Sequence, residues 1–232
     1  MEYYLHSQFW WLVSLVIPLA VGLYAHFRVT GAYHKYAQIS SHSGMTGRDA
    51  AAVVLERAGI TNVSIREIGG EMTDHYDPEH RTLALSSENY HGTSLAAIGV
   101  SAHEAGHAIQ HKQGYAPMNF RMGLVPSVNA ASMALPFVMI GGFLFGRAGG
   151  WLLDLGIGCY LAITLFHLVT LPVEFDASNR AKVQLAGAGI ADASEMTGIR
   201  DMLDAAGFTY VASFLASILN LIYLIVLRNE EK

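Results

Sequence analysis

Hydrophobic residues gather in four long runs along the chain, and two longer stretches between these runs mix polar and apolar positions. A helix needs about 20 predominantly apolar residues to cross a bilayer. Four runs approach this length: Phe9–Ala25, Leu124–Phe145, Trp151–Leu171 and Phe208–Leu227. We therefore predict four transmembrane helices, in preference to a soluble protein with unusually apolar core helices.

These runs divide the chain into five segments. We expect an N-terminal transmembrane anchor over 1–27, a folded region over 28–122, a transmembrane hairpin over 123–171, a helical region over 172–207 and a C-terminal transmembrane helix over 208–232. The first run has no basic residues before it and no small-residue cleavage site after it, which is typical of an uncleaved signal anchor.

The distribution of lysine and arginine predicts an orientation. Residues 1–8 carry neither, and Arg147 is alone between the second and third runs, whereas both longer stretches carry several. Because cytoplasmic loops are enriched in positive residues, both stretches should face the cytoplasm and the N-terminus should face outward. Arg228 and Lys232 would then lie outside, against the rule, so the topology of the last helix is the weakest part of this assignment.

Two helices are predicted within 28–122. Thr46-Gly-Arg-Asp49 resembles a capping box ahead of a helix over Ala50–Ala58. Thr93 or Ser94 can cap a second helix that runs to about Gly114.

The part between these helices has the pattern of short strands and a turn. Val63–Ile68 and Thr82–Ser86 alternate between apolar and polar residues, and we expect the second of them at a sheet edge. Asp74–Pro78 has turn chemistry around a proline. In the second stretch, the third membrane helix should continue past a kink at Pro172, and Glu195–Ala206 should form an amphipathic helix.

Composition supports a membrane protein and excludes some function classes. Of the 232 residues 52% are hydrophobic and only 14% are charged, whereas soluble domains carry about a quarter charged residues. The net charge of −5 gives no indication of nucleic acid as a partner. The single Cys159 excludes an intrachain disulfide and a cysteine-rich zinc module.

The segment "HEAGH" carries the strongest chemical signal. His103 and His107 are four residues apart, so on a helix both imidazoles face one zinc ion, and Glu104 lies beside the open coordination position. Zinc lowers the pKa of water toward about 7, and Glu104 can take the proton as general base. The alternative is a pair of hydrogen-bonded histidines on a buried helix. Four residues further on, His111 cannot easily reach the same ion from one straight helix.

A catalytic zinc ion needs a third protein ligand. Asp154 and Glu174 are the candidates, and about 30 Å of helix separates them at 1.5 Å per residue. The chain crosses the membrane once between His107 and Asp154 but twice between His107 and Glu174. Glu174 therefore returns to the side of the histidines, and we predict it as the third ligand.

Longer runs of sequence carry a family resemblance. "HEAGHAIQH", a membrane hairpin and then "LVTLPVEFDAS" resemble the YugP-type membrane-bound neutral zinc metallopeptidases, from about Tyr33 onward. The chain is more distantly similar to the HtpX/Ste24-type membrane proteases. In those, E-x-x-x-D supplies an aspartate that braces a histidine ligand. Ser178 occupies that position here, so a bracing carboxylate must come from elsewhere, with Asp176 as the candidate although it points off the Glu174 face.

The resemblance also implies a place for the substrate. An edge strand before the zinc helix would pair with an extended substrate backbone, and Leu83–Ser86 is the candidate. His75 or Tyr76 could donate a hydrogen bond to the oxyanion that forms on the substrate. Equally, both residues could simply close a turn with Asp77 and Pro78.

We therefore predict a mainly α integral membrane protein with about four transmembrane helices and a small cytoplasmic α+β, zincin-like metallopeptidase domain. It would use one catalytic Zn²⁺ ion to hydrolyse protein or peptide substrates, including membrane proteins, at the cytoplasmic face of the cell membrane. Its partners would be these substrates and the lipid bilayer, and a homo-oligomer or membrane partner proteins are compatible with this reading. The alternative is a proteolytically silent zinc-binding scaffold or regulator. A transporter is disfavoured because the four runs show no repeated halves.

Overall fold

A computed structural model describes residues 2–145 and 149–230 of the chain. Within these residues, four helices are long and apolar enough to cross a membrane: Gln8–Ala37, Ala116–Gly142, Gly150–Gly187 and Ala193–Asn229. Four membrane helices were predicted, and four candidates are found. Arg147 and Lys232, which entered the orientation argument, lie outside the described residues.

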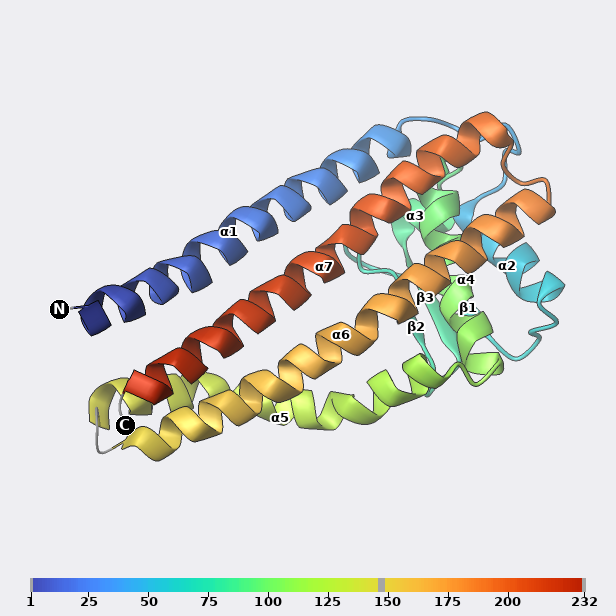
Figure 1. Ribbon diagram of the computed structural model, residues 1–232. Coiled ribbons are helices and arrows are strands. Elements are labelled where there is room, and N and C mark those ends of the chain that lie inside the picture. Colours follow the sequence, from blue (N-terminus) through green and yellow to red (C-terminus); the bar gives the residue numbers. More distant parts are fainter. Residues whose placement is uncertain (1, 146–148, 231–232) are drawn as a thin grey trace. The chain divides into compact units, whose positions relative to one another are not determined.

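Seven helices and three strands make up the described chain (Figure 1). Their order is α1 (Glu2–Ala37), α2 (Gly47–Arg57), β1 (Ser64–Ile68), β2 (His75–Asp77), β3 (Thr82–Ser86), α3 (Ser87–His91), α4 (Leu95–Lys112), α5 (Ala116–Phe145), α6 (Gly150–Gly187) and α7 (Ala193–Glu230). The fold is therefore mostly helical with one small sheet.

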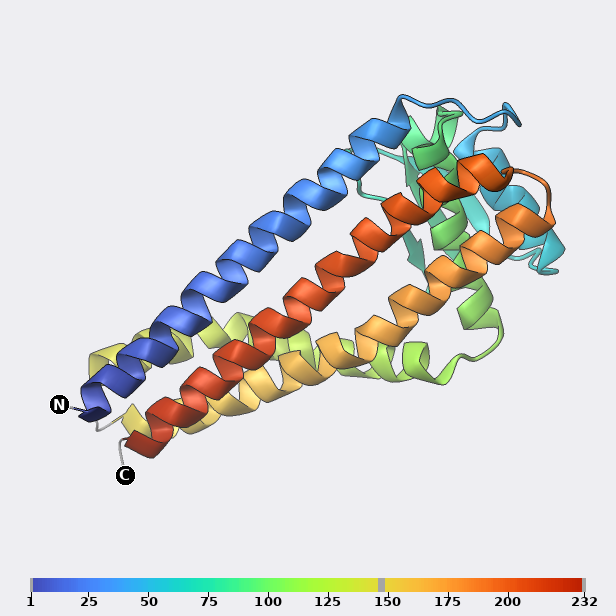
Figure 2. The same cartoon turned by 45° about the horizontal axis from the view of Figure 1, so that its top comes forward.

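The chain forms two compact units. The helical unit comprises 1–25, 120–171 and 209–232, and the mixed unit comprises 26–119 and 172–208. Helices α6 and α7 each run unbroken through both units, as Figure 2 shows. Pro172 lies inside α6, which continues past it, and the helix expected over Glu195–Ala206 is the beginning of α7.

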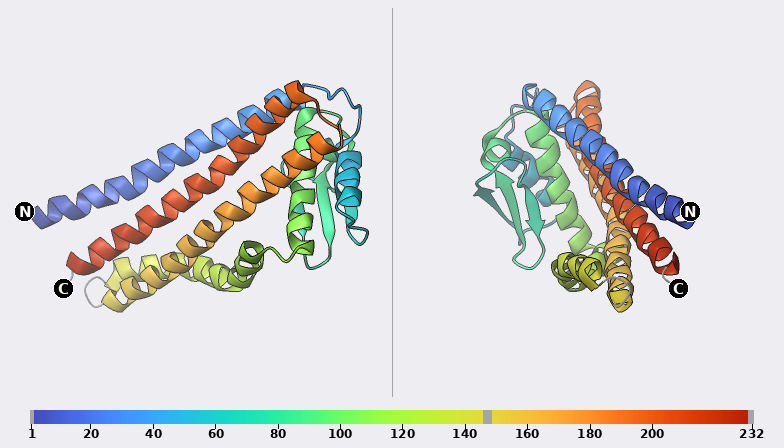
Figure 3. Two further views of the ribbon diagram at one scale, coloured as in Figure 1. Left: turned by 45° about the vertical axis from the view of Figure 1, so that its right-hand side comes forward. Right: turned by 90° about the vertical axis from the view of Figure 1, so that its left-hand side faces the viewer.

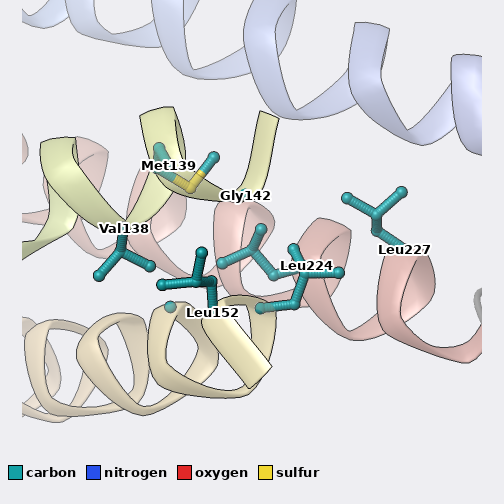
Figure 4. Close-up of a pocket in the computed structure, with 8 residues that line it drawn as sticks. Val138, Met139, Gly142, Leu152, Leu224 and Leu227 are labelled. Atoms are coloured by element: carbon teal, nitrogen blue, oxygen red, sulfur yellow. The ribbon is translucent and has the colours of Figure 1, made fainter. Parts of the chain in front are cut away.

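Apolar packing and an ion pair characterise the described residues of the helical unit. Apolar residues of helices α5, α6 and α7, among them Val138, Leu152 and Leu224, line a cavity of about 190 Å³ (Figure 4). Arg228 donates from Nε and from one terminal nitrogen to the two carboxylate oxygens of Asp154, at 2.7 and 2.9 Å. The first residues of α6 and the last residues of α7 therefore lie together.

The sheet of the mixed unit has the order β1-β3-β2. Strand β1 pairs with β3 in parallel, and β2 pairs with β3 antiparallel. The expectation that Thr82–Ser86 is an edge strand is wrong, because β3 has a hydrogen-bonded neighbour on each side. The turn expected over Asp74–Pro78 is also wrong in part, since pairing with β3 draws His75–Asp77 into a strand.

The two faces of this sheet differ. Ile65, Leu83 and Tyr76 form one row across the three strands and pack in the core with residues of α2 and α4. Arg66, Ala84 and His75 form the next row on the opposite face, where Arg66 and His75 are exposed. Figure 3 shows the strands alongside α4.

Local capping explains where the two helices of this region begin. The Thr46 hydroxyl accepts from the Asp49 backbone N–H while the Asp49 carboxylate accepts from that of Thr46, which confirms the predicted capping box ahead of α2. The Ser94 hydroxyl accepts from the backbone N–H of Ala97, so Ser94 is the N-cap of α4. Each cap satisfies N–H groups that have no partner within the helix.

Candidate metal centre

Helix α4 carries the "HEAGH" segment into the interior of the mixed unit. Most residues of α4 are buried, including Glu104 and His107, and the His103 side chain is only 14% exposed. Small residues at Ala102, Ala105 and Ala108 allow this burial because they let neighbouring elements approach closely. The polar side chains of this segment are therefore held in a largely dry setting.

Two imidazoles and one carboxylate converge between α4 and α6. Nε2 of His103 lies 3.2 Å from Oε2 of Glu174, and Nε2 of His107 lies 3.4 Å from the same oxygen. The three ligand atoms lie within 4.8 Å of one another, and Glu174 is 2% exposed. Two imidazole nitrogens and one carboxylate oxygen are a ligand set of catalytic zinc sites, so these residues fit a zinc ion.

The close approach of the two helices depends on Gly106. A Cβ atom at this position would lie 2.6 Å from the backbone oxygen of Ala177, far inside van der Waals contact. Gly106 lies between His103 and His107 in sequence, and Ala177 lies one turn beyond Glu174. The lack of a side chain at Gly106 therefore allows the two ligand-bearing helices to meet.

Each histidine is supported on its other ring nitrogen. His103 Nδ1 lies 3.1 Å from the Ser178 hydroxyl, and His107 Nδ1 lies 3.0 Å from Oε1 of Gln110. Ser178, at the position where the more distant resemblance implies a bracing aspartate, thus contacts a histidine itself. The sequence reasoning did not identify Gln110, although its spacing of three from His107 places both on one helix face.

The electrostatics of the site agree with a positive centre at this point. Burial alone would lower the pKa of His107, but its hydrogen bond to Glu174 and the negative charges of Glu174 and Glu104 outweigh burial and raise that pKa above its usual range. No hydrogen bond or ion pair of the Glu104 side chain is found in 2–145 and 149–230. Its carboxylate is therefore available to a water molecule.

The other residues considered in the sequence lie elsewhere. Asp154 is paired with Arg228 and is not part of the ligand group. The Tyr76 hydroxyl lies 2.8 Å from Nδ1 of His111, beside a cavity of about 250 Å³ whose lining does not include His103, Glu104, His107 or Glu174. His75 is exposed, and its Nδ1 lies 2.9 Å from the carbonyl oxygen of Thr73.

A second group of possible ligands, His42, Asp192 and Glu195, has a structural explanation. One oxygen of Asp192 accepts from the backbone N–H groups of Ser194 and Glu195, and the Glu195 carboxylate accepts from those of Asp192 and His42. This arrangement is a capping box at the beginning of α7. Its carboxylates are occupied by the helix cap, and we do not interpret the group as a metal site.

Comparison with known proteins bears on the same residues. A family model described as "Putative neutral zinc metallopeptidase" matches residues 11–229 of the chain. The chain belongs to this family. It is also 38% identical over 212 residues to "Putative membrane protease YugP" of Bacillus subtilis (strain 168), covering 91% of this chain and 93% of that protein. No solved structure matches the chain.

Family membership confirms the resemblance seen in the sequence. The matched range 11–229 contains the HEAGH segment, Glu174 and all of the four membrane-length helices except the first three residues of Gln8–Ala37. The neutral zinc metallopeptidase family is named for the metal that suits the His103, His107 and Glu174 cluster. The ligand and catalytic roles of individual residues remain predictions.

Proposed function

We propose that this protein is a membrane-embedded, zinc-dependent endopeptidase that hydrolyses peptide bonds of protein or peptide substrates at the cytoplasmic membrane face. The observation that carries the proposal is the convergence of His103 Nε2, His107 Nε2 and Glu174 Oε2, with Glu104 beside them on the same helix. A buried structural site would gain nothing from an adjacent carboxylate with no hydrogen-bond partner of its own, which argues against a proteolytically silent scaffold.

Four residues of the protein would have distinct roles in the proposed reaction. His103, His107 and Glu174 would hold zinc, which supplies a Lewis acid for the scissile carbonyl and for water. The Glu104 carboxylate would take a proton from the attacking water and then deliver it to the leaving amine.

The substrate would bind as an extended strand on the free edge of β2. This replaces the assignment to Leu83–Ser86, since both edges of β3 are already paired. Of the two oxyanion-stabilising candidates, Tyr76 lies on the sheet face that packs toward α4, whereas His75 lies on the exposed face. We therefore retain Tyr76 as the donor to test, with a movement of the substrate-bound strand needed to bring it to the reacting carbonyl.

The membrane location is supported by the four apolar helices and by the relative described as a membrane protease. The cytoplasmic orientation rests on the lysine and arginine distribution. Substrates at the membrane surface, membrane proteins among them, would reach the site from the cytoplasm. The bilayer itself is a partner, and a homo-oligomer or further membrane proteins are compatible with the exposed apolar surface of α1.

Replacing the proposed base tests the mechanism. We expect Glu104→Gln to retain zinc and to lower peptide-bond cleavage by about 10²- to 10⁴-fold, which is the usual contribution of general acid–base catalysis. Zinc content of the detergent-purified protein and cleavage of an unfolded substrate protein are measured together. Glu56→Gln, at an exposed position of α2, is the matched control and should leave both unchanged. Wild-type cleavage rates in Glu104→Gln would refute the mechanism.

Replacing the two candidate third ligands tests the metal centre. We expect Glu174→Ala to lose stoichiometric zinc, because two histidines alone hold the ion weakly. Asp154→Ala should keep it, since Asp154 is bound by Arg228 and lies outside the ligand group. Metal analysis of both purified variants decides between them. Zinc retained by Glu174→Ala and lost by Asp154→Ala would reverse the ligand assignment, and zinc without any proteolysis would favour the scaffold.

A further inference from the structure

The Gln110 side chain lies next to His107, and both of its polar atoms make hydrogen bonds. Gln110 is fully buried at 0% exposure. Its amide nitrogen donates to the carbonyl oxygen of Val173 and to Oδ2 of Asp176, each at 2.8 Å. Its amide oxygen lies 3.0 Å from Nδ1 of His107.

These contacts permit only one orientation of the Gln110 amide. The Val173 carbonyl and the Asp176 carboxylate are both acceptors, so they require the NH₂ group of Gln110 to face them. A flipped amide would direct its oxygen at two acceptors and leave buried groups unpaired, which is costly. The amide oxygen is therefore fixed toward His107.

We propose that Gln110 is a positioning residue that fixes the tautomer of His107. An amide oxygen can only accept, so Nδ1 of His107 must carry the hydrogen. In the neutral imidazole this leaves the lone pair on Nε2, the atom that faces Glu174. Gln110 thereby presents the metal-binding nitrogen of His107. The inference rests on the proposed function, because it assumes that His103, His107 and Glu174 hold zinc.

The orientation of Gln110 is itself secured across two helices. Asp176 also accepts a hydrogen bond from Nε of Arg180, and the Arg180 guanidinium donates to Oε1 of Gln113, which is the C-cap of α4. The Asp176 carboxylate is thus paired with the Arg180 guanidinium. The bracing carboxylate that the resemblance requires is Asp176, which acts on His107 through Gln110 rather than directly on His103.

The two histidine ligands are consequently supported unequally. Ser178 contacts Nδ1 of His103 through a hydroxyl, which can either donate or accept. It leaves both tautomers of His103 open. Removing Gln110 should therefore weaken metal binding more than removing Ser178.

The closing experiment measures zinc affinity by competition with a chromophoric chelator, using the full-length chain in detergent. We expect Gln110→Met, which keeps the volume but removes the acceptor, to weaken zinc binding about 10- to 100-fold. Ser178→Ala should have a smaller effect. Gln184→Met, on α6 and outside the network, should bind zinc like the wild type.

The tautomer of His107 distinguishes positioning from simple packing. Histidine side-chain ¹⁵N shifts of the zinc-free protein are measured at a pH above the raised His107 pKa, where the ring is neutral. They should report the Nδ1–H form of His107 in the wild type, but a tautomer mixture in Gln110→Met, because only the amide oxygen of Gln110 fixes that hydrogen.

Wild-type zinc affinity in folded Gln110→Met would overturn the inference, as would a tautomer mixture of His107 in the wild type. If Gln110→Met does not fold, the ¹⁵N shifts of the wild type decide. Zinc bound by the wild type without peptide cleavage would refute the proposed endopeptidase and leave the role of Gln110 intact. A wild type that binds no zinc would overturn both.

Discussion

At the scale of single residues, the cluster of His103, His107 and Glu174 depends on the absence of a side chain at Gly106 as well as on the side chains around it. The Ala177 backbone oxygen occupies the space in which a side chain would lie. The histidines and Glu174 come from helices α4 and α6, so their separation follows that of the two backbones. The absence of a side chain at Gly106 therefore allows the three candidate ligands to lie close together.

We expect Gly106→Ala to destabilise the protein by about 1–3 kcal/mol, the usual cost of overpacking a core, and to weaken zinc binding. The matched control is Gly123→Ala on α5, where an added Cβ meets nothing within 4 Å. Thermal unfolding and zinc titration of both variants in detergent check this. Equal behaviour of the two variants would show that the α4–α6 approach is not limiting.

At the scale of elements, side-chain hydrogen bonds at helix ends stabilise the mixed unit. The beginning of α7 is the clearest case, because Asp192 accepts from two backbone N–H groups and from the Ser194 hydroxyl. These hydrogen bonds lower the pKa of Asp192 to about 2. The negative charge near the positive end of the helix dipole is also favourable.

This pKa predicts a pH dependence of stability. A carboxyl group whose folded-state pKa is lowered stabilises the fold fully above its unfolded pKa, near 3.9, and loses that contribution as the pH falls through about 2. Asp192→Asn retains an acceptor but has no charge to titrate. We therefore expect the wild type to unfold at a higher temperature than Asp192→Asn near pH 6, with the difference shrinking between about pH 4 and 2. A difference that grows on acidification would contradict the assignment.

At the scale of the whole chain, the ion pair between Asp154 and Arg228 bears on topology. It brings the first residues of α6 next to the last residues of α7, and this agrees with the proposed topology, in which these two helix ends lie on the same side of the membrane. Arg228 opposed the positive-inside argument in the sequence. Its pairing with a carboxylate explains how an arginine can be accommodated there, because much of its charge is neutralised.

Cysteine labelling tests the proposed orientation. In a Cys159→Ser background, Asn229→Cys should react with a membrane-impermeant maleimide in intact cells, since the C-terminus is expected outside. Glu56→Cys, exposed on α2 of the mixed unit, should react only after lysis. The reverse pattern would place the candidate metal centre outside the cell and overturn the cytoplasmic proposal.

Much of the fold was predictable because its signals are local. Four apolar runs, the Thr46 capping box and the Ser94 cap depend on residues within a few positions of one another, and all are found. The place of Thr82–Ser86 in the sheet was not predictable in this way. Pairing on both sides of β3 depends on the neighbours that the chain brings to it, and the three-residue strand β2 exists only through that pairing.

The candidate site, like the fold, was predictable from the sequence only in part. The sequence by itself predicted a zinc site with His103, His107 and Glu174 as ligands and Glu104 as base, because the spacing within one helix and the number of membrane crossings are properties of the chain. The structure brings the three candidate ligands together. Only the tertiary structure decided which groups contact the other ring nitrogens of the two histidines. Ser178, Gln110 and Asp176 act through hydrogen bonds between α4 and α6, and the partner of a hydrogen bond across two helices is set by their packing rather than by spacing along either one.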